Sequence, residues 1–588
     1  MGEKIVAIVG ARLNSSRLPG KHLLPLAGTP LIERLWQRLS KIEALSEIVL
    51  ATTDDAYNAP LRDWAEKTGR TTFSFGGGID DVVGRVDAAV GHFNADILVY
   101  VCGDCPLVEP ETIARMLAEM VDKPEIESVL LENGRAGQKN IHEGFDIYRR
   151  SFWNQMVTAA QEPFEREHVG AVYHRLGKVT PKGIAYVKEP VAFSRLEHRI
   201  SVDTPSDYRF MNKVYADWYA DNAPDSIVDL KHVIARLCAE PALRNINRHV
   251  YQKGLNDTPL KAVIITESGA DVGLGHLMRM LAVTAAMQDF MGAKMTVVIK
   301  GQQIEEPELS LVPHIWVDDF SSAAVATVLK DNPLHIVDLK DPGSFLTERQ
   351  KLEVSNSVLI GVDLPEIHLP VADMAWVPSF YLSEKAAAHA NIHYGWDCFL
   401  LRDAPLWQRG QGGTSKKLLV LTGGSDVTGL GEHLPAHLSR ILPDDISIDW
   451  VQGPYAAAPN VPDAEEGRDF TLLEAPANLP HLFGKYDVVL CVFGVSFFEC
   501  MRAGVPTIVF DPVGAASPTE WAILQKEFPN IVASGLDEAV GKLVEMVSQG
   551  VENASTENIS EKLQQGPEHF ARKVAALMEN TAPIKKVG

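Results

Sequence analysis

The sequence predicts an α/β protein made of several parallel sheets with helices on their faces. Two observations carry this prediction. Apolar runs of strand length alternate with segments of helical periodicity along most of the 588 residues. The alternation breaks and restarts twice, at residues 251–261 and 409–417, where glycine and polar residues gather. We therefore expect three domains, at residues 1–250, 260–410 and 416–582, of which the last two are Rossmann-like lobes in tandem.

Composition narrows the class of protein. Hydrophobic residues make up 46% of the chain and charged residues 22%, which is ordinary for a globular protein. The formal net charge of −22 argues against a nucleic-acid partner, which would require a basic field. The six cysteines form no disulfide framework, no apolar run reaches membrane-spanning length, and the N-terminus lacks a signal-peptide pattern. We therefore expect a cytoplasmic protein without a membrane partner.

The elements of the first domain follow one another in a βαβαβ order. The expected strands are "KIVAIVG", "EIVLATT" and "ADILVYVCGD", and the expected helices between them are "PLIERLWQRLSKI" and "APLRDWAEKTG". In a parallel sheet of this kind, polar sites lie at the carboxyl ends of the strands. Both "GARLNSSR" and "CGDCP" follow a strand directly, so the sequence places the first site there.

The loop after the first strand, "ARLNSSRLPGK" at residues 11–21, is basic in an acidic chain. It holds Arg12, Arg17 and Lys21 and no carboxylate, and a loop in this position is a natural cradle for phosphate. The three cations would balance a triphosphate, and Gly20 lets the main chain come close to it. A solvated loop with ordinary surface cations is the alternative, and the loop alone does not decide between the two.

Four further motifs follow this loop in order: "DDVVGR" (80–85), "GDCPLVEP" (103–110), "EREHV" (165–169) and "SVDTPSDY" (201–208). Together they resemble the cytidylyltransferases that make CMP-sugar acids, such as the CMP-KDO and CMP-sialate synthetases, and above all the spore coat polysaccharide cytidylyltransferase family. The resemblance spans roughly residues 4–215. It implies a Rossmann-like nucleotidyltransferase domain that transfers CMP from CTP to a 2-keto-3-deoxy sugar acid. We expect a nonulosonic acid of the sialic, legionaminic or pseudaminic type.

The resemblance also assigns roles to residues. Arg12, Lys21 and Asp104 would be catalytic, with the two cations holding the triphosphate. Asp104 and Asp203 would hold Mg²⁺, whose preference for hard oxygen ligands suits two carboxylates and phosphate. A plain turn or helix cap is the alternative for either aspartate. The candidates for substrate contacts are Ser16, Arg17, Arg85, Arg166 and His168, of which the histidine has an ordinary polar helix position as its alternative.

The second half carries its own glycine-rich turns. Its expected strands are "KAVIITESG", "KMTVVIKG", "LHIVDLK" and "SVLIGVD" in one lobe, then "LLVLTGGSD", "ISIDWVQGP", "DVVLCVFG" and "PTIVFD" in the other. Three stretches, at residues 265–287, 421–426 and 493–506, fit a backbone that approaches a phosphate or sugar. They resemble the UDP-sugar hydrolases of pseudaminic acid biosynthesis over roughly residues 260–580. This resemblance implies a two-lobed glycosyltransferase-B fold with a nucleotide sugar as ligand.

By the same resemblance, His276 would be the base that activates water, with a helix cap as its alternative role. Relatives carry Arg and Asp where this chain has Ile265 and Glu267, which leaves hydrolase activity open. Glu499 would hydrogen-bond the ribose, or else be a surface helix residue. The backbone groups of Gly423, Gly424 and Ser425 would cradle the diphosphate, and the hydroxyl of Ser496 would assist them.

The sequence therefore predicts a bifunctional enzyme of surface-polysaccharide sugar biosynthesis. Its first domain would use CTP, a sugar acid and Mg²⁺, and its second half would hydrolyse or bind a nucleotide sugar. One alternative for the second half is a glycosyltransferase, and another is a non-catalytic half that only binds a nucleotide sugar. The nucleotide base, the identity of the sugar acid and homo-oligomer formation are left open.

Overall fold

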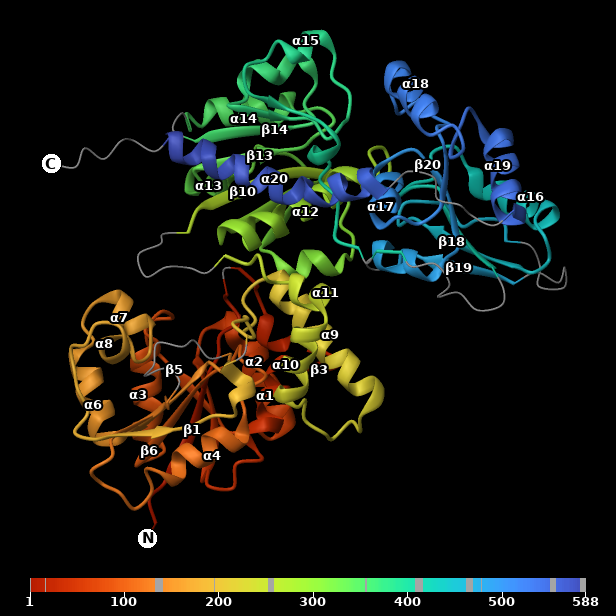
Figure 1. The fold of residues 1–588 in the computed structure, drawn as a ribbon. Helices are drawn as coiled ribbons and strands as arrows, with labels where there is room; N and C mark the ends of the chain where they lie inside the picture. The colour runs from red at the N-terminus through yellow and green to blue at the C-terminus, as the bar shows by residue number, and fades with distance from the viewer. Residues whose placement is uncertain are drawn as a thin grey trace. The chain divides into compact units, whose positions relative to one another are not determined.

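The computed structural model describes residues 2–581 except 16, 133–140, 195, 252–258, 355–356, 405, 408–415, 462–468, 477–478 and 550–556. The chain divides into two units, Met1–Val250 and Tyr251–Gly588 (Figure 1). Within the described ranges, no helix combines the length and the apolar character needed to cross a membrane.

The first unit is built on one sheet of seven strands in the order β5-β4-β1-β6-β8-β7-β9. The strands are β1 (Ile5–Gly10), β4 (Glu47–Thr53), β5 (Thr72–Phe75), β6 (Ile97–Cys102), β7 (Ser128–Leu131), β8 (Phe145–Arg149) and β9 (Ile184–Val187), with a separate ribbon of β2 (Pro25–Leu26) and β3 (Thr29–Pro30). β1 runs parallel to β4 and β6, as predicted. β8 runs antiparallel to β6, which the sequence did not predict because strand direction depends on the connection.

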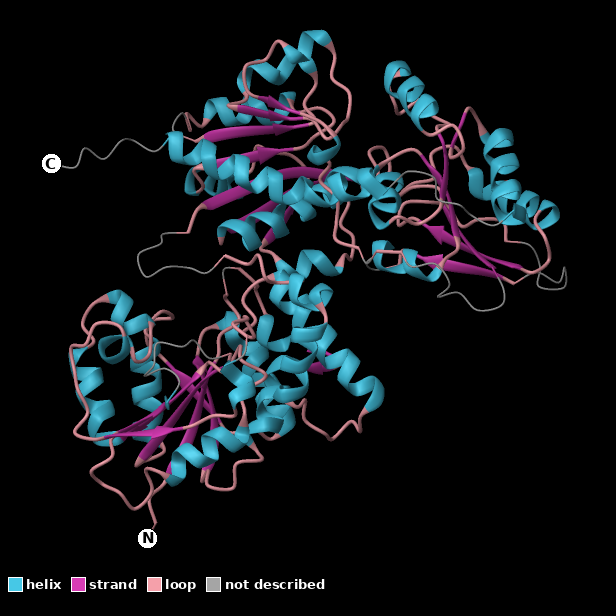
Figure 2. Cartoon of the chain, in the orientation of Figure 1, coloured by secondary structure: helices cyan, strands magenta, loops and turns pink. Residues whose placement is uncertain are grey.

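Helices surround this sheet (Figure 2). They are α1 (Leu31–Leu39), α2 (Ala59–Thr68), α3 (Val82–His92), α4 (Pro110–Ala118), α6 (Arg150–Ala159), α7 (Pro163–Glu167), α8 (Ala171–His174), α9 (Pro205–Asp221), α10 (Leu230–Ala239) and α11 (Pro241–Asn245). Successive side chains of β1 enter two different cores. Ala7 and Val9 pack with α1, while Val6 and Ile8 pack with α3. Both faces of β1 are therefore buried, which explains its unbroken apolar run.

The second unit contains two parallel sheets. The first has the order β12-β11-β10-β13-β14-β15-β16. Its strands are β10 (Lys261–Ser268), β11 (Lys294–Gly301), β12 (His314–Val317), β13 (Leu334–Val337), β14 (Val358–Val362), β15 (Met374–Trp376) and β16 (Ile392–His393). Its helices are α12 (Gly275–Met291), α13 (Ala323–Asp331), α14 (Gly343–Lys351) and α15 (Glu384–Ala387).

The second sheet of this unit has the order β19-β18-β17-β20-β21-β22. Its strands are β17 (Lys416–Leu421), β18 (Ile446–Gln452), β19 (Phe470–Glu474), β20 (Val488–Val492), β21 (Thr507–Phe510) and β22 (Val532–Ala533). Its helices are α16 (Leu434–Ile441), α17 (Val495–Ala503), α18 (Pro518–Glu527) and α19 (Leu536–Gln549). In both sheets the first strand lies inside. The following strands are added on one side of it and later ones on the other side, so the strand order switches between β10 and β13 in one sheet and between β17 and β20 in the other. This is the doubly wound Rossmann arrangement, and the switch point is where such sheets bind ligands. The predicted two-lobed α/β architecture is thus confirmed.

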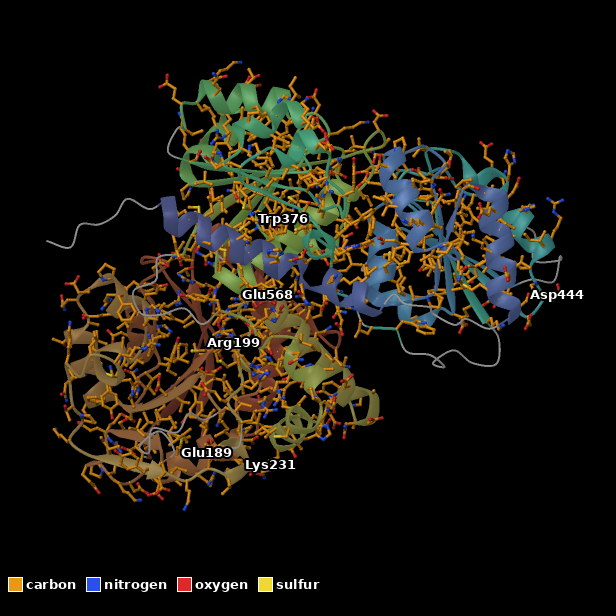
Figure 3. All side chains as sticks on the ribbon, turned by 45° about the horizontal axis from the view of Figure 1, so that its top comes forward. Glu189, Arg199, Lys231, Trp376, Asp444 and Glu568 are labelled. Carbon is orange, nitrogen blue, oxygen red and sulfur yellow. The ribbon has the colours of Figure 1, made fainter. Side chains whose placement is uncertain are left out.

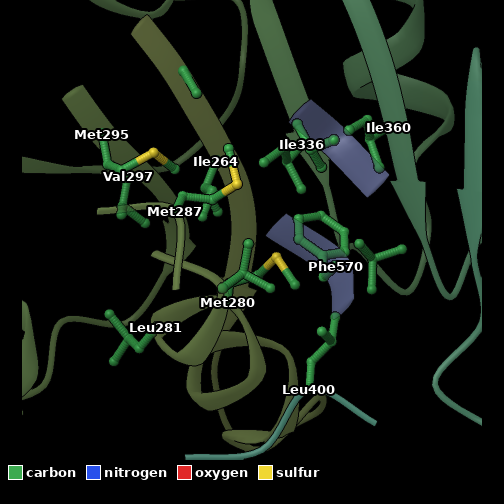
Figure 4. Close-up of a cluster of buried hydrophobic side chains, with 14 of the residues drawn as sticks. Ile264, Met280, Leu281, Met287, Met295, Val297, Ile336, Ile360, Leu400 and Phe570 are labelled. Carbon is green, nitrogen blue, oxygen red and sulfur yellow. The ribbon is translucent and has the colours of Figure 1, made fainter. Parts of the chain in front are cut away.

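The last helix, α20 (Glu557–Thr581), belongs to both lobes. Leu563 lies in the core of the second lobe, whereas Phe570 and Val574 lie in the core of the first. Figure 4 shows Phe570 among side chains from the first sheet and α12. Its ring packs edge-on against Trp376, with 5.0 Å between ring centroids; Figure 3 labels this tryptophan and, on α20, Glu568.

Candidate functional site

The first candidate site begins where β1 and β6 end side by side. Gly10 and Cys102, their last residues, are paired in the register of the two strands. The Gly103 N–H donates to the Gly10 carbonyl at 2.9 Å, and a Cβ on Gly103 would lie only 2.8 Å from that oxygen. The Val202 N–H donates to the carbonyl of Asp104 at 2.9 Å. These backbone contacts bring three separate motifs together at one edge of the sheet.

Lys21 lies at the meeting point of these motifs. Its Nζ is 2.6 Å from Oδ2 of Asp104 and 2.8 Å from Oδ1 of Asp203, and the residue is only 5% exposed. Burial by itself lowers the pKa of Lys21, but the two carboxylates outweigh it and raise the pKa. Three of the residues predicted for triphosphate and metal binding therefore form one charged cluster.

Two arginines also form ion pairs with Asp203. The NH2 group of Arg17 lies 3.3 Å from its Oδ2, and Arg199 pairs with the same carboxylate. Burial raises the pKa of Asp203, but the charges of Lys21, Arg17 and Arg199 hold it well below its usual range. Arg199, labelled in Figure 3, was not predicted, although it lies only four residues before the aspartate. Its Nε also donates to Asp207 at 3.0 Å, in the first turn of α9.

Arg12 points to a different group of residues. Its NH1 donates to the carbonyl of Ile79 at 3.1 Å and to Asp80 at 2.5 Å, in the loop that precedes α3. The Asp80 side chain is 76% exposed, and exposed ion pairs contribute little free energy, so phosphate can replace this partner. Binding of the triphosphate by Arg12 stays a prediction.

Two of the other predicted contacts lie at the same loop. Arg166 pairs with Asp81 at 2.6 Å, and Asp81 caps α3 through the Gly84 N–H. Arg85 is 2% exposed, and its Nε has no hydrogen-bond partner among the described residues. Burial lowers the pKa of Arg85, and the charge of Arg12 lowers it further. The three arginines thus gather around residues 79–81.

His168 makes its described contacts within its own helix. His168 terminates α7, and its Nδ1 lies 3.0 Å from the Phe164 carbonyl while its ring stacks on that phenyl ring. This local pairing matches the ordinary helix role that was its alternative. Ser16 lies outside the described residues. Sequence reasoning missed His22, which is 3% exposed, packs against Gly103 and stays neutral because burial lowers its pKa to about 3.

The second candidate site is a cavity of about 1400 Å³ in the second unit. Loops that follow β10, β17 and β20 line it, so it lies at the carboxyl ends of strands in both sheets. The structure brings all the residues predicted for this half together along its wall, namely His276, Gly423, Gly424, Ser425, Ser496 and Glu499.

The loops that line this cavity come into close contact. A Cβ on Gly424 would lie 3.2 Å from the Leu274 side chain and 3.3 Å from its backbone nitrogen, so a side chain here would require Leu274 to shift by a few tenths of an ångström. The hydroxyls of Ser268 and Tyr455 are 2.7 Å apart and join the same two lobes. The glycine loop of one lobe is thereby held against the start of α12, the helix that carries His276 in the other lobe.

His276 has a buried carboxylate behind it. Its Nδ1 is 2.7 Å from Oδ1 of Asp338, a fully buried residue that directly follows β13. Arg279, one turn further along α12, donates to both oxygens of Asp338 at 2.7 and 2.8 Å and to Asp363 at 3.0 Å. Burial lowers the pKa of His276, but the charge of Asp338 outweighs it and raises the pKa. Neither Asp338 nor Arg279 was predicted.

Glu499 has a partner already. Its two oxygens accept from Arg402 at 2.9 and 3.3 Å, and both residues are buried although they line the cavity. A ribose contact would have to share this carboxylate with the guanidinium, so that role stays a prediction. Glu306, also on the cavity wall, was missed; burial raises its pKa to about 7, and its Oε1 has no partner among the described residues.

The two positions at which relatives differ lie away from the cavity wall. Ile265 is fully buried in the core on one face of the first sheet. Glu267 accepts a hydrogen bond of 2.5 Å from the Lys340 N–H and so fixes the loop after β13. Neither residue is among those that line the cavity.

Comparison with known proteins supports the cytidylyltransferase resemblance predicted for the first unit. Residues 6–216 match a family model described as cytidylyltransferase. An uncharacterized protein of Methanocaldococcus jannaschii is 28% identical over 254 residues, which are 43% of this chain and 98% of that protein. The 3-deoxy-manno-octulosonate cytidylyltransferase of Geobacter sulfurreducens is 33% identical over 122 residues, which are 21% of this chain and 47% of that enzyme. The match thus spans about half the length of this enzyme. The predicted cytidylyltransferase-family region is confirmed.

Similar solved structures include a calicheamicin glycosyltransferase, with 12% identity and a TM-score of 0.38 over 55% of this chain and 100% of that chain. The expected likeness of the second half to UDP-sugar hydrolases is not confirmed by these comparisons and stays a prediction.

Proposed function

We propose that the first unit transfers CMP from CTP to a 2-keto-3-deoxy sugar acid. The observation that carries this proposal is the meeting of Lys21, Asp104 and Asp203 at the carboxyl edge of the sheet. These residues come from three of the five motifs, and the family match over residues 6–216 supports the same class of reaction.

In this reaction a hydroxyl oxygen of the sugar acid loses its proton to solvent and forms a bond to the α-phosphorus of CTP. Pyrophosphate leaves with the electrons of the broken P–O bond. Negative charge grows on the phosphate oxygens, so catalysis depends on positioning and on charge neutralisation. Lys21 and Arg17 supply positive charge at one end of the site, and Arg12, Arg85 and Arg166 supply it at the loop of residues 79–81.

Asp104 and Asp203 fit a bound Mg²⁺. One oxygen of each lies within 2.8 Å of the same lysine nitrogen, so both can reach one small cation, and both are hard ligands. When bound, Mg²⁺ would neutralise charge on the phosphate oxygens.

The test is pyrophosphate release from each of the four nucleoside triphosphates against a panel of 2-keto-3-deoxy sugar acids, including eight-carbon and nine-carbon members. We expect release only with CTP and only when an acceptor acid is present. Release that does not depend on a sugar acid would contradict the proposal.

For the second unit we propose that the cavity binds a nucleotide sugar and hydrolyses it. The supporting observation is the position of His276 between the cavity and the buried Asp338. When Asp338 accepts the Nδ1 hydrogen, the lone pair stays on Nε2, which can take a proton from water as the water attacks. Backbone groups at Gly423 and Gly424 would receive the diphosphate.

A glycosyltransferase is the second candidate, because the cavity is larger than a nucleotide sugar needs. Its volume of about 1400 Å³ exceeds the roughly 300–1,000 Å³ of common ligand sites, which leaves room for an acceptor. The experiment measures free sugar and nucleotide from a panel of UDP-sugars, with and without added sugar acceptors, in the wild type and in His276→Asn. Turnover in water alone supports hydrolysis, and turnover that requires an acceptor supports transfer. Binding without turnover in either condition would contradict both activities.

A further inference from the structure

The ammonium group of Lys21 lies where the metal of the first unit would have to lie. It contacts one oxygen of Asp104 at 2.6 Å and one of Asp203 at 2.8 Å, and its side chain is 6% exposed. These are the two carboxylates that fit Mg²⁺. The lysine therefore satisfies the ligands that the ion would use.

A divalent cation and this ammonium group cannot share the carboxylates. Mg²⁺ binds oxygen at about 2.0–2.1 Å, so an ion that bridges both oxygens would overlap the position of Nζ. At such separations the two cations repel each other strongly even in a polar protein environment. Arg17 and Arg199 also contact Asp203, and Arg199 shares its charge with Asp207, so cations already surround Asp203 before any metal arrives.

The triphosphate changes this balance. It brings about four negative charges close to Lys21 and offers the ammonium group new oxygen partners. The flexible four-carbon side chain of lysine can turn to them without a change in the backbone. Once the lysine has moved, the oxygens of Asp104 and Asp203 that it contacted can bind a metal that also contacts the phosphates, while Arg17 and Arg199 stay on the other oxygen of Asp203.

We propose that Lys21 is a displaceable counter-cation that keeps divalent metal off Asp104 and Asp203 until CTP arrives. The metal and CTP then bind with positive coupling, since each favours the arrangement in which the lysine has left the carboxylates. This inference rests on the function proposed for the first unit.

Mn²⁺ is the probe, and its binding to the full-length chain is measured from the electron paramagnetic resonance signal of free Mn²⁺. Without nucleotide, Lys21→Met should bind Mn²⁺ at least about tenfold more tightly than the wild type, because a competing charge is gone. Adding CTP should tighten Mn²⁺ binding strongly in the wild type and much less in the variant. Lys41→Met, at an exposed position in the same unit, is the matched control and should behave like the wild type.

Equal or weaker binding of Mn²⁺ by Lys21→Met overturns the inference. Asp104→Asn separates this failure from failure of the proposed function. If Asp104→Asn leaves Mn²⁺ binding in the presence of CTP unchanged, the metal role proposed for Asp104 falls together with the inference, while CMP transfer is decided separately by pyrophosphate release. If Asp104→Asn loses the ion while Lys21→Met gains nothing, only the inference falls.

A structure of the wild type removes any dependence on how the variants fold. Crystals grown with Mn²⁺ and a non-hydrolysable CTP analogue should show the anomalous signal of manganese between the two carboxylates, with Lys21 turned to the phosphates. Manganese at that position with the Lys21 contacts to both aspartates intact would overturn the inference.

Discussion

The Asp104 carboxylate contacts Lys21 and lies just after β6, at the edge of the sheet where the first site is built. Asp104→Asn should lower CMP transfer by several orders of magnitude, roughly 3–5 kcal/mol in the activation free energy, the scale of a lost electrostatic stabiliser. The amide keeps the size of the side chain and removes its charge. Steady-state kinetics in saturating Mg²⁺ measure this effect.

Asp63→Asn, on the exposed face of α2, is the control and should keep full activity. Near-normal turnover by Asp104→Asn, with an unchanged melting temperature, would show that the carboxylate does not bind the metal.

Asp338 sets the protonation of His276. The base form of the imidazole is the neutral one, so hydrolysis should rise with pH through a histidine pKa that lies above 6.5. Asp338→Asn removes the charge that raises this pKa, so the rising limb should move to lower pH while kcat falls about 10²-fold or more. The pH profile of kcat distinguishes this effect from a loss of folding, which would lower the rate without moving the limb.

The raised pKa of His276 also affects stability. A histidine whose pKa is higher in the folded state stabilises the fold fully below its unfolded pKa of about 6.5, and this contribution is lost as pH rises through the folded value. In Asp338→Asn the stability of the second unit should vary less with pH in that window.

At the scale of elements, the contact between the ends of β1 and β6 leaves no room for a side chain at Gly103. A Cβ there would lie 2.8 Å from the Gly10 carbonyl oxygen, with the Ala11 and His22 side chains at 2.9 and 3.0 Å, so Gly103→Ala must displace a neighbouring loop. We expect a loss of about 1–3 kcal/mol in the free energy of unfolding and a larger loss of CMP transfer, since Asp104 moves with its neighbour. Urea denaturation and kinetics measure the two effects.

Gly91→Ala is the matched control. Gly91 lies in α3 with nothing within 4 Å of its added Cβ, so this change should raise helix stability by about 0.5–1 kcal/mol and leave transfer unchanged. Equal behaviour of the two variants would mean that the close approach at Gly103 is unimportant.

Helix α20 should be essential to the second site although it carries none of the residues that line the cavity. Phe570→Ala removes a fully buried ring from the core of the first lobe, which should cost about 3–5 kcal/mol and abolish binding of UDP-sugars. CMP transfer should be unaffected. Arg572→Ala, whose side chain is 72% exposed, is the control on the same helix and should change stability by only a few tenths of a kcal/mol.

Polar sites in a parallel sheet lie at the carboxyl ends of its strands, and this rule explains which site residues could be predicted. Arg12 and Asp104 lie just after β1 and β6, Gly423 and Gly424 lie just after β17, and Lys21 lies at the far end of the basic loop that begins at β1, so local sequence carries the signal. Asp338 also follows a strand, but it lies 62 residues from His276, and their contact depends on β13 lying beside β10. Strand order is set by packing across the sheet, which no local pattern shows. The pairing of Arg12 with Asp80 and the Arg402–Glu499 pair are long-range contacts of the same kind.

At the scale of the whole molecule, the division at Val250–Tyr251 separates the two candidate sites. A fragment that ends near Gly254 should fold and transfer CMP with the kinetics of the full chain, because every residue proposed for that site lies before the division. The measurement is pyrophosphate release by the purified fragment, with circular dichroism to show that it is folded. A folded but inactive fragment beside an active full chain would mean that the first unit depends on the second.

Helix α20 has a consequence for the order in which the chain becomes structured during synthesis. Phe570 and Val574 complete a core whose first strand begins at Lys261, so this core must wait until roughly 300 further residues have left the ribosome. At about 5–20 residues per second, the interval is on the order of 15–60 s. The first unit, whose core residues all lie before residue 251, has no such delay. Its site can be complete on a nascent chain while the second half still exposes apolar surface, and that half is the part most in need of chaperone protection.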